Sequence, residues 1–133
     1  MKGISDTLLC SLWRKACLIF WKNRCVICGC VRRDEDLQVH HLCKRSHLIT
    51  RYDWRNGFPV CVRIEGKETC HQKADSKEGQ DIIRRKIGDE MYFELDRLSR
   101  QTIQDYCLKT GQTRGEFLLE KKAELKGIIE GAE

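Results

Sequence analysis

Apolar residues recur at helical spacing near the start of the chain, in the stretch SDTLLCSLWRKACLIFWKN. The positions that share one face are Leu9, Trp13, Ala16, Cys17 and Phe20. Ser5 or Asp6 can act as N-cap, because each carries an oxygen that accepts a hydrogen bond from the first helical turn. The pattern therefore predicts an amphipathic helix over residues 5–23.

The pattern changes between Cys25 and Cys70, where short apolar pieces are separated by polar and glycine-containing stretches. LQVHHL and GFPVCV have the length and composition of two short β-strands. Residues 62–69 separate Cys61 from Cys70, and we expect a hairpin tip there, built on Glu65, Gly66 and Lys67.

Helical spacing returns after Cys70. One apolar stripe that runs on through Gly88 contains Ile83, Ile87, Met91, Leu95 and Leu98. A second helix is predicted from Ile103 to Lys109, closed by Gly111. A third follows TRGE, where Thr113 and Glu116 have capping-box spacing, and its apolar positions are Phe117, Leu118, Leu125, Ile128 and Ile129.

A chain of 133 residues suits one domain with its own core. We divide it into an N-terminal helix (1–24), a metal-organised core (25–76) and a helical extension (77–133). No apolar run approaches the length of a membrane span, and the charge order near the N-terminus is wrong for a signal peptide. We expect no membrane partner and a cytoplasmic location.

Positive charge is concentrated in the first half, where residues 1–75 carry 14 Lys and Arg against 8 Asp and Glu. Residues 76–133 carry 11 against 12. The basic excess therefore coincides with the cysteines and histidines, as expected if a polyanion is held near a metal site. A merely solvated basic surface remains the alternative.

Nine cysteines without an export signal favour metal binding over disulfides. Cys25 and Cys28 form a CxxC pair, and Cys61 with Cys70 can complete a four-cysteine structural zinc site. A redox CxxC would need a βαβ pattern that the sequence lacks. Cys30 or Cys43 could replace one ligand, whereas buried free thiols are expected at Cys10, Cys17 and Cys107.

Three motifs follow one another in the core: VHHL with His40 and His41, RNGFPVC with Asn56, and TCHQK with His71. In this order they resemble the HNH, or ββα-metal, endonuclease family. CVICG, KRSH and RYDWRN further resemble phage recombination nucleases of the NinG/Rap type. The resemblance covers about residues 25–75 and implies an α+β fold, a small ββα-metal core flanked by an N-terminal helix and C-terminal helices.

The resemblance also implies a role for each matching residue. His40 and His71 would hold one catalytic divalent ion, His41 would be the general base, and Asn56 would brace the loop so that a backbone carbonyl fixes the tautomer of His41. Imidazole ligands suit Mn²⁺, Ni²⁺ or Zn²⁺, with Mg²⁺ the least well matched. Asp75 is a candidate third ligand, although a solvated surface carboxylate is the commoner role.

Basic residues lie close in sequence to the proposed scissile phosphate: Lys44, Arg45, Arg51, Arg55 and Lys73. We expect them to contact DNA phosphates and make binding salt-dependent. Tyr52 and Trp54 could stack on an unpaired base, although core packing is the more common role for such a tryptophan. His47 could contact phosphate, bind zinc or lie on the surface.

The residues and the resemblance together predict metal-dependent, sequence-tolerant hydrolysis of DNA phosphodiester bonds. We expect the protein to be encoded by a phage or mobile element and to act in a bacterial host. Branched recombination intermediates are the substrate suggested by the resemblance. A zinc-bound nucleic-acid-binding module without catalysis is the main alternative. A cysteine–histidine hydrolase is weaker, because zinc-bound thiolates are poor nucleophiles. The apolar stripes of the C-terminal helices leave room for a homodimer.

Overall fold

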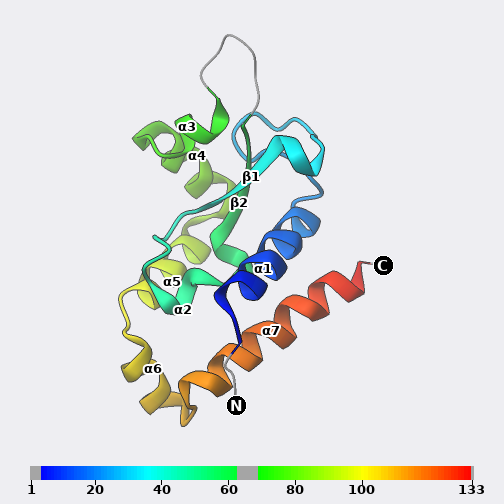
Figure 1. Ribbon diagram of the computed structural model, residues 1–133. Helices are drawn as coiled ribbons and strands as arrows, with labels where there is room; N and C mark the ends of the chain where they lie inside the picture. The colour runs from blue at the N-terminus through cyan, green and yellow to red at the C-terminus, as the bar shows by residue number, and fades with distance from the viewer. Residues whose placement is uncertain (1–3, 63–68, 133) are drawn as a thin grey trace.

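The computed structural model describes residues 4–62 and 69–132 and has mixed α and β secondary structure (Figure 1). This bears out the α+β class. The hairpin tip expected at residues 65–67 lies outside the described residues.

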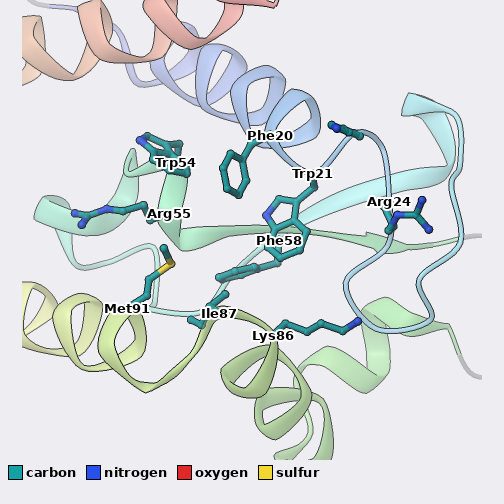
Figure 2. Close-up of a pocket in the computed structure, with 10 residues that line it drawn as sticks. Phe20, Trp21, Arg24, Trp54, Arg55, Phe58, Lys86, Ile87 and Met91 are labelled. Atoms are coloured by element: carbon teal, nitrogen blue, oxygen red, sulfur yellow. The ribbon is translucent and has the colours of Figure 1, made fainter.

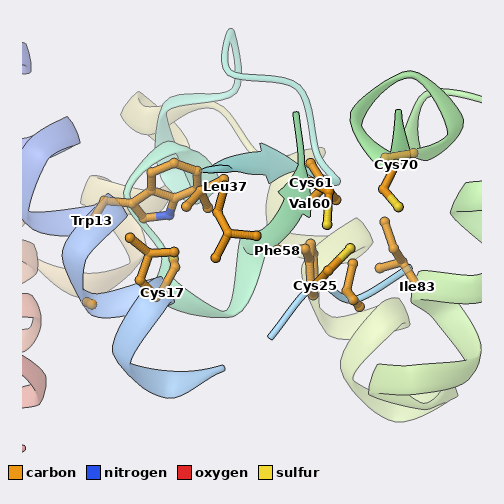
Figure 3. Close-up of a cluster of buried hydrophobic side chains, with 14 of the residues drawn as sticks. Trp13, Cys17, Cys25, Leu37, Phe58, Val60, Cys61, Cys70 and Ile83 are labelled. Atoms are coloured by element: carbon orange, nitrogen blue, oxygen red, sulfur yellow. The ribbon is translucent and has the colours of Figure 1, made fainter. Parts of the chain in front are cut away.

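The first helix, α1 (Asp6–Phe20), is the one that the apolar spacing predicts. The Ser5 hydroxyl accepts a hydrogen bond from the backbone N–H of Leu8, so Ser5 and not Asp6 is the N-cap. Leu9, Trp13 and Cys17 are buried on one face of α1. This face lies against the sheet, where Trp13 and Cys17 lie beside Leu37 (Figure 3).

The two predicted strands, β1 (Leu37–His41) and β2 (Gly57–Cys61), pair as an antiparallel two-stranded sheet. His40 lies opposite Phe58, and His41 lies opposite Gly57. Directly opposed residues place their side chains on the same face. Adjacent residues point to opposite faces, so His40 and His41 face opposite sides of the sheet.

One short helical turn leads into β1, two more lie between the strands, and α3 follows β2. Periodicity does not reveal elements this short, and the sequence predicted none of the three turns. They are η1 (Asp34–Asp36), α2 (Leu48–Arg51) and η2 (Trp54–Asn56), and the helix after β2 is α3 (Cys70–Ala74). Helix α3 contacts both strands, and Figure 1 shows it with α4 on the side of the hairpin away from α1.

The stripe predicted to run through Gly88 is divided between two helices, α4 (Lys77–Ile87) and α5 (Asp89–Ser99). The expectation of a continuous helix was wrong. Gly88 has φ +86°, which residues with a side chain rarely adopt, so the chain turns there and the apolar spacing resumes on a second axis.

The last two helices were predicted correctly from their capping residues. Helix α6 (Ile103–Thr110) ends at Gly111, whose N–H donates to the carbonyl of Cys107. Helix α7 (Arg114–Gly131) begins with both hydrogen bonds of the capping box between Thr113 and Glu116.

Helix α7 packs along α1 (Figure 1), so the C-terminal segment belongs to the same core as the hairpin. Leu125 and Ile129 of α7 are buried in one cluster with Leu9 and Trp13 of α1. Part of the apolar stripe that left room for a homodimer is therefore covered within the chain. The homodimer itself stays a prediction.

Candidate functional site

Four cysteines from three segments converge at one end of the hairpin. Cys25 and Cys28 lie in the loop after α1, Cys61 ends β2 and Cys70 begins α3. Their Sγ atoms all lie within 4.8 Å of one another, and the sulfurs of Cys28 and Cys61 are 3.6 Å apart. Figure 3 shows Cys25, Cys61 and Cys70 around this point. The cluster is the set that the spacing predicted.

The loop that presents Cys25 and Cys28 is folded by its own backbone. The N–H of Cys25 donates to the carbonyl of Cys30, and the N–H of Gly29 donates to the carbonyl of Cys25. The N–H of Val26 donates to Pro59 of β2, which ties the loop to the edge of the sheet. The N–H of Cys28 also donates to the Cys25 sulfur at 3.5 Å.

This donor set fits a structural zinc ion. Tetrahedral zinc with Zn–S bonds of about 2.3 Å separates its sulfur ligands by about 3.8 Å, close to the distance between Cys28 and Cys61. Burial raises the pKa of Cys28, but hydrogen bonds from the Cys30 backbone and the Cys25 thiol outweigh it and lower the pKa to about 6. Burial raises the pKa of Cys61 to about 11 and also raises that of Cys70. Four adjacent thiolates need a cation to offset their charge.

The two spare thiols considered as replacement ligands lie outside this cluster. Cys30 is exposed, and Cys43 donates a weak hydrogen bond to the carbonyl of Leu95. Cys17 is a buried free thiol as expected, and burial raises its pKa. Cys10 and Cys107 are half-buried, so the expectation of full burial was wrong for these two.

On the α3 side of the sheet, His40 faces the segment that carries His71. Nδ1 of His40 lies 3.7 Å from a carboxylate oxygen of Asp75, the residue that caps the end of α3. Burial lowers the pKa of His40, Asp75 raises it and the nearby ring of His71 lowers it. Within the described residues, the cysteines are the sole compact group of three or more His, Cys, Asp or Glu ligand atoms. His40, His71 and Asp75 are therefore less closely grouped than the four cysteines.

On the other side of the sheet, His41 stacks on Trp13 of α1, with ring centroids 4.0 Å apart and planes 9° apart. Gly57, directly opposite His41, makes room for this contact. A Cβ on Gly57 would clash with the Cys17 sulfur and lie 2.7 Å from Cζ2 of Trp13. The indole therefore takes the place of the side chain that Gly57 lacks.

Besides stacking on Trp13, the ring of His41 contacts a backbone carbonyl. Nε2 of His41 lies 3.0 Å from the carbonyl oxygen of Arg51. Burial lowers the pKa of His41, which favours the neutral ring. If Nε2 carries the proton and donates it to this carbonyl, Nδ1 is left with a free lone pair.

Asn56 is fully buried and holds together the segment that supplies this carbonyl. Its side-chain oxygen accepts from the N–H of Cys43 at 2.7 Å, and its amide donates to the carbonyls of Cys43 and Thr50 at 3.1 Å each. Thr50 directly precedes Arg51. These hydrogen bonds tie Asn56 to the loop after β1, and the bracing role expected of it stays a prediction.

The basic residues predicted to bind DNA differ in whether their charge is already paired with a carboxylate of the protein. Arg55 makes a two-pronged contact with the buried carboxylate of Asp53, so its charge is already compensated within the protein. Lys73 pairs with Glu78 at 3.2 Å. Lys44 is exposed.

Arg45 and Arg51 converge on the carboxylate of Asp6, which the sequence suggested only as a helix cap. A guanidinium nitrogen of Arg45 lies 2.5 Å from Asp6, and one of Arg51 lies 3.9 Å away. The buried Tyr52 also donates its hydroxyl to Asp6. These pairs cross 39 or more positions in sequence, so no local signal could have revealed them.

No protein-family model matches the chain, and searches of curated proteins and of solved structures found no match either. The function must therefore be inferred from the residues and their arrangement.

A hollow with a volume of about 430 Å³ lies between the end of α1, the η2 turn and helices α4 and α5 (Figure 2). It is lined by Phe20, Trp21, Lys22, Arg24, Trp54, Arg55, Phe58, Lys86, Ile87 and Met91. Of these, the sequence had singled out only Trp54 and Arg55 as functional candidates. Phe20 was expected on the buried face of α1, yet 49% of its surface is exposed, so that expectation was wrong.

His47 lies at the N-terminus of α2 and lines a smaller polar hollow with Lys44 and Asp96. It is outside the cysteine cluster, so the structure gives it no part in the candidate zinc site. In the described part of the chain, no helix has the length and apolar character to cross a membrane.

Proposed function

We propose that this protein is a metal-dependent DNA endonuclease of the HNH type. The observation that carries the proposal is the placement of two adjacent histidines. His40 faces Asp75 and the ring of His71, while His41 is held by a backbone carbonyl on the opposite face. A general base on one face and a candidate cation site on the other would flank one phosphate between them, and these are the two functions that phosphodiester hydrolysis requires.

His40 and His71 are the residues that would hold the catalytic ion, with Asp75 as a third candidate. Two imidazoles and a carboxylate suit Mn²⁺, Ni²⁺ or Zn²⁺ better than Mg²⁺. When bound, a divalent ion supplies Lewis-acid stabilisation of the charge that develops on the phosphate and on the leaving oxygen. A set of three protein ligands leaves room for a phosphate oxygen and for water.

His41 would accept the proton of the attacking water. Donation from Nε2 to the Arg51 carbonyl selects the tautomer in which Nδ1 is the acceptor. Stacking on Trp13 fixes the plane of the ring. A base held in one tautomer and one orientation is presented to water without a further conformational change.

The phosphate contacts expected from the basic residues are distributed unevenly in this proposal. Lys44 is exposed and is the best candidate to neutralise a neighbouring phosphate, whereas Arg45 is exposed but already paired with Asp6. Arg55, engaged by Asp53, is better explained as a structural residue. The four-cysteine cluster would hold zinc as a structural ion, because four protein ligands leave no open coordination position.

A zinc-bound nucleic-acid-binding module without catalysis remains the second candidate function. Such a module would use the four cysteines and the basic surface. A binding module would have no need for the ring of His41 to be held by the Arg51 carbonyl and by Trp13. Nor would it need His40 and His71 as candidate metal ligands.

Nicking of supercoiled plasmid tests the proposal. The purified protein is treated with EDTA, and Mn²⁺, Mg²⁺, Ni²⁺ or Zn²⁺ is added back to separate aliquots. We expect wild type to nick with at least one metal and His41→Ala to lose about 100- to 10,000-fold of the rate, as is typical when a general base is removed.

The matched control is His47→Ala, which removes an exposed histidine six positions away and should leave the rate within about twofold of wild type. Wild type that binds the plasmid but nicks it with none of the four metals would overturn the proposal and favour the binding module. Equal rates for His41→Ala and wild type would exclude His41 as the base.

A further inference from the structure

The hollow between α1 and α4 combines aromatic side chains with a basic end. Phe20, Trp21 and Trp54 contribute ring surfaces, and the ring centroids of Phe20 and Trp54 are 4.6 Å apart. Phe20 leaves half of its surface in water, although α1 has a buried face available for aromatic residues. The volume of the hollow, about 430 Å³, falls in the usual range of small-ligand sites.

Charge is distributed unevenly around this hollow. Figure 2 shows Arg24 and Lys86 at one end, away from Trp54, Arg55 and Met91, and Lys22 is a further cationic lining residue. Glutamates belong to the other end, where Glu124 accepts from the Trp54 indole at 3.2 Å and Glu90 lines an adjoining hollow with Arg55. An anionic group is therefore favoured at the Arg24 and Lys86 end.

We propose that this hollow binds an unpaired nucleotide of single-stranded DNA. The base stacks on the aromatic side chains, and the flanking phosphates contact Lys22, Arg24 and Lys86. An aromatic ring such as that of Trp54 can stack on any base, because every base has a π face. Cations beside an aromatic platform are the arrangement by which single strands are held without sequence preference.

The choice of DNA over another polyanion rests on the proposed endonuclease function, whereas the stacking and charge argument does not. The hollow and the candidate histidine site are different sites that both involve the β1–β2 hairpin. Phe58, which lines the hollow from β2, is the direct cross-strand partner of His40 on β1. Phe58 is 1% exposed, and neither His40 nor His41 is among the residues that line the hollow.

Intrinsic tryptophan fluorescence can test this site without any nuclease activity. Trp21 and Trp54 line the hollow, while Trp13 is buried against His41. The zinc-loaded full chain is titrated with an eight-nucleotide oligo(dT) in buffer without added catalytic metal. We expect saturable quenching, and a dissociation constant raised about tenfold or more by Phe20→Ala.

Two controls separate the hollow from the rest of the surface. Phe93→Ala removes another exposed phenylalanine, on α5 and outside the hollow, and should leave the dissociation constant unchanged. Lys86→Glu should weaken binding and flatten its salt dependence, whereas Lys126→Glu on the exposed face of α7 should do neither. Circular dichroism verifies that each variant folds.

An eight-unit abasic phosphate chain tests whether the base is required, and it should bind at least tenfold more weakly than oligo(dT). Equal binding of the abasic chain would overturn the proposal in favour of a simple anion site. Equal binding by wild type, Phe20→Ala and Lys86→Glu would place the single strand elsewhere. A plasmid that is never nicked would overturn the endonuclease and leave these binding results standing.

Discussion

The two ends of the β1 and β2 hairpin are built differently. At one end four cysteines from three segments close around a single point, with their sulfurs within 4.8 Å of one another. At the other end His40 and His41 face opposite sides of the sheet, and hydrogen bonds, stacking and ion pairs hold their surroundings. A closed ligand set can fix a fold, whereas an open one leaves positions for substrate.

The difference also concerns how each end is assembled. Once it holds an ion, the cysteine end would depend on a few strong bonds to that ion, which are lost together if a ligand is removed. The histidine end depends on many weak contacts, which include those of Asn56 and Asp6 with the loop after β1. We therefore expect large, cooperative effects at the first end and graded effects at the second.

The largest effect is expected for Cys28→Ser. Structural zinc contributes about 10–16 kcal/mol of apparent binding free energy in small zinc domains, which is comparable to the whole stability of an ordinary domain. The variant should lose most of its zinc and its cooperative thermal unfolding, as measured by elemental analysis and circular dichroism. Cys30→Ser is the matched control, because Cys30 is also exposed but lies outside the cluster.

If Cys28→Ser retains one equivalent of zinc and the wild-type unfolding curve, the cysteine end is not a four-ligand site. Loss of zinc in Cys30→Ser as well would point to a different ligand set in the same loop.

A smaller effect is expected at the histidine end for Gly57→Ala. The added methyl would clash with Cys17 and Trp13, and overpacking of this kind costs about 1–3 kcal/mol. Displacement of Trp13 should also loosen the His41 ring, so nicking should fall by more than the loss of folded protein explains. Chemical denaturation and plasmid nicking measure the two effects.

Gly127→Ala is the control for this variant. A Cβ at Gly127 meets no atom within 4 Å, and alanine is favoured over glycine inside a helix such as α7 by about 0.5–1 kcal/mol. This change should stabilise the protein slightly. Wild-type stability and activity in Gly57→Ala would show that the stack on Trp13 is unimportant.

The smallest effect is expected for Asp6→Asn. The hydrogen bond from Tyr52 is the main reason that the pKa of Asp6 lies below its ordinary value of 3.8, with smaller contributions from Cys10 and Arg45. A lowered pKa in the folded state adds stability above pH 3.8, and this stability is lost as the pH falls through the lowered value. Since Asp6 is half exposed, its ion pairs should contribute about 1 kcal/mol or less.

Urea denaturation of wild type and Asp6→Asn at pH 7, where thiolate ligands can still hold zinc, tests the ion-pair contribution at low ionic strength and in 1 M salt. The difference in unfolding free energy should shrink in 1 M salt, which screens exposed ion pairs. A difference that is as large in 1 M salt as at low ionic strength would mean that the charge of Asp6 is not what stabilises this corner.

The sequence predicted those parts of the molecule in which a local pattern decides the structure. Ser5, Thr113 and Glu116 marked helix starts because capping is a contact between residues three positions apart. The four cysteines were recognised because thiolate ligands have few other roles in such a spacing. The break at Gly88 was missed, because apolar spacing does not report the φ angle of a single residue.

Long-range contacts explain most of what could not be predicted. Trp13 was correctly placed in the core, but its stack on His41 depends on the register that sets His41 opposite Gly57. Asp6 was considered only as a helix cap, because its partners Arg45 and Tyr52 are distant in sequence. The aromatic hollow is formed jointly by the end of α1, η2, β2, α4 and α5, and no one segment carries its signature.

The stack of His41 on Trp13 has a consequence for the entropy of the reaction that we propose. An imidazole free to turn about its side-chain bonds would have to be ordered again each time a substrate bound. Trp13 and the Arg51 carbonyl restrict that rotation when the chain folds. The loss of rotational freedom then occurs once in the lifetime of the molecule and is not repeated in each catalytic cycle.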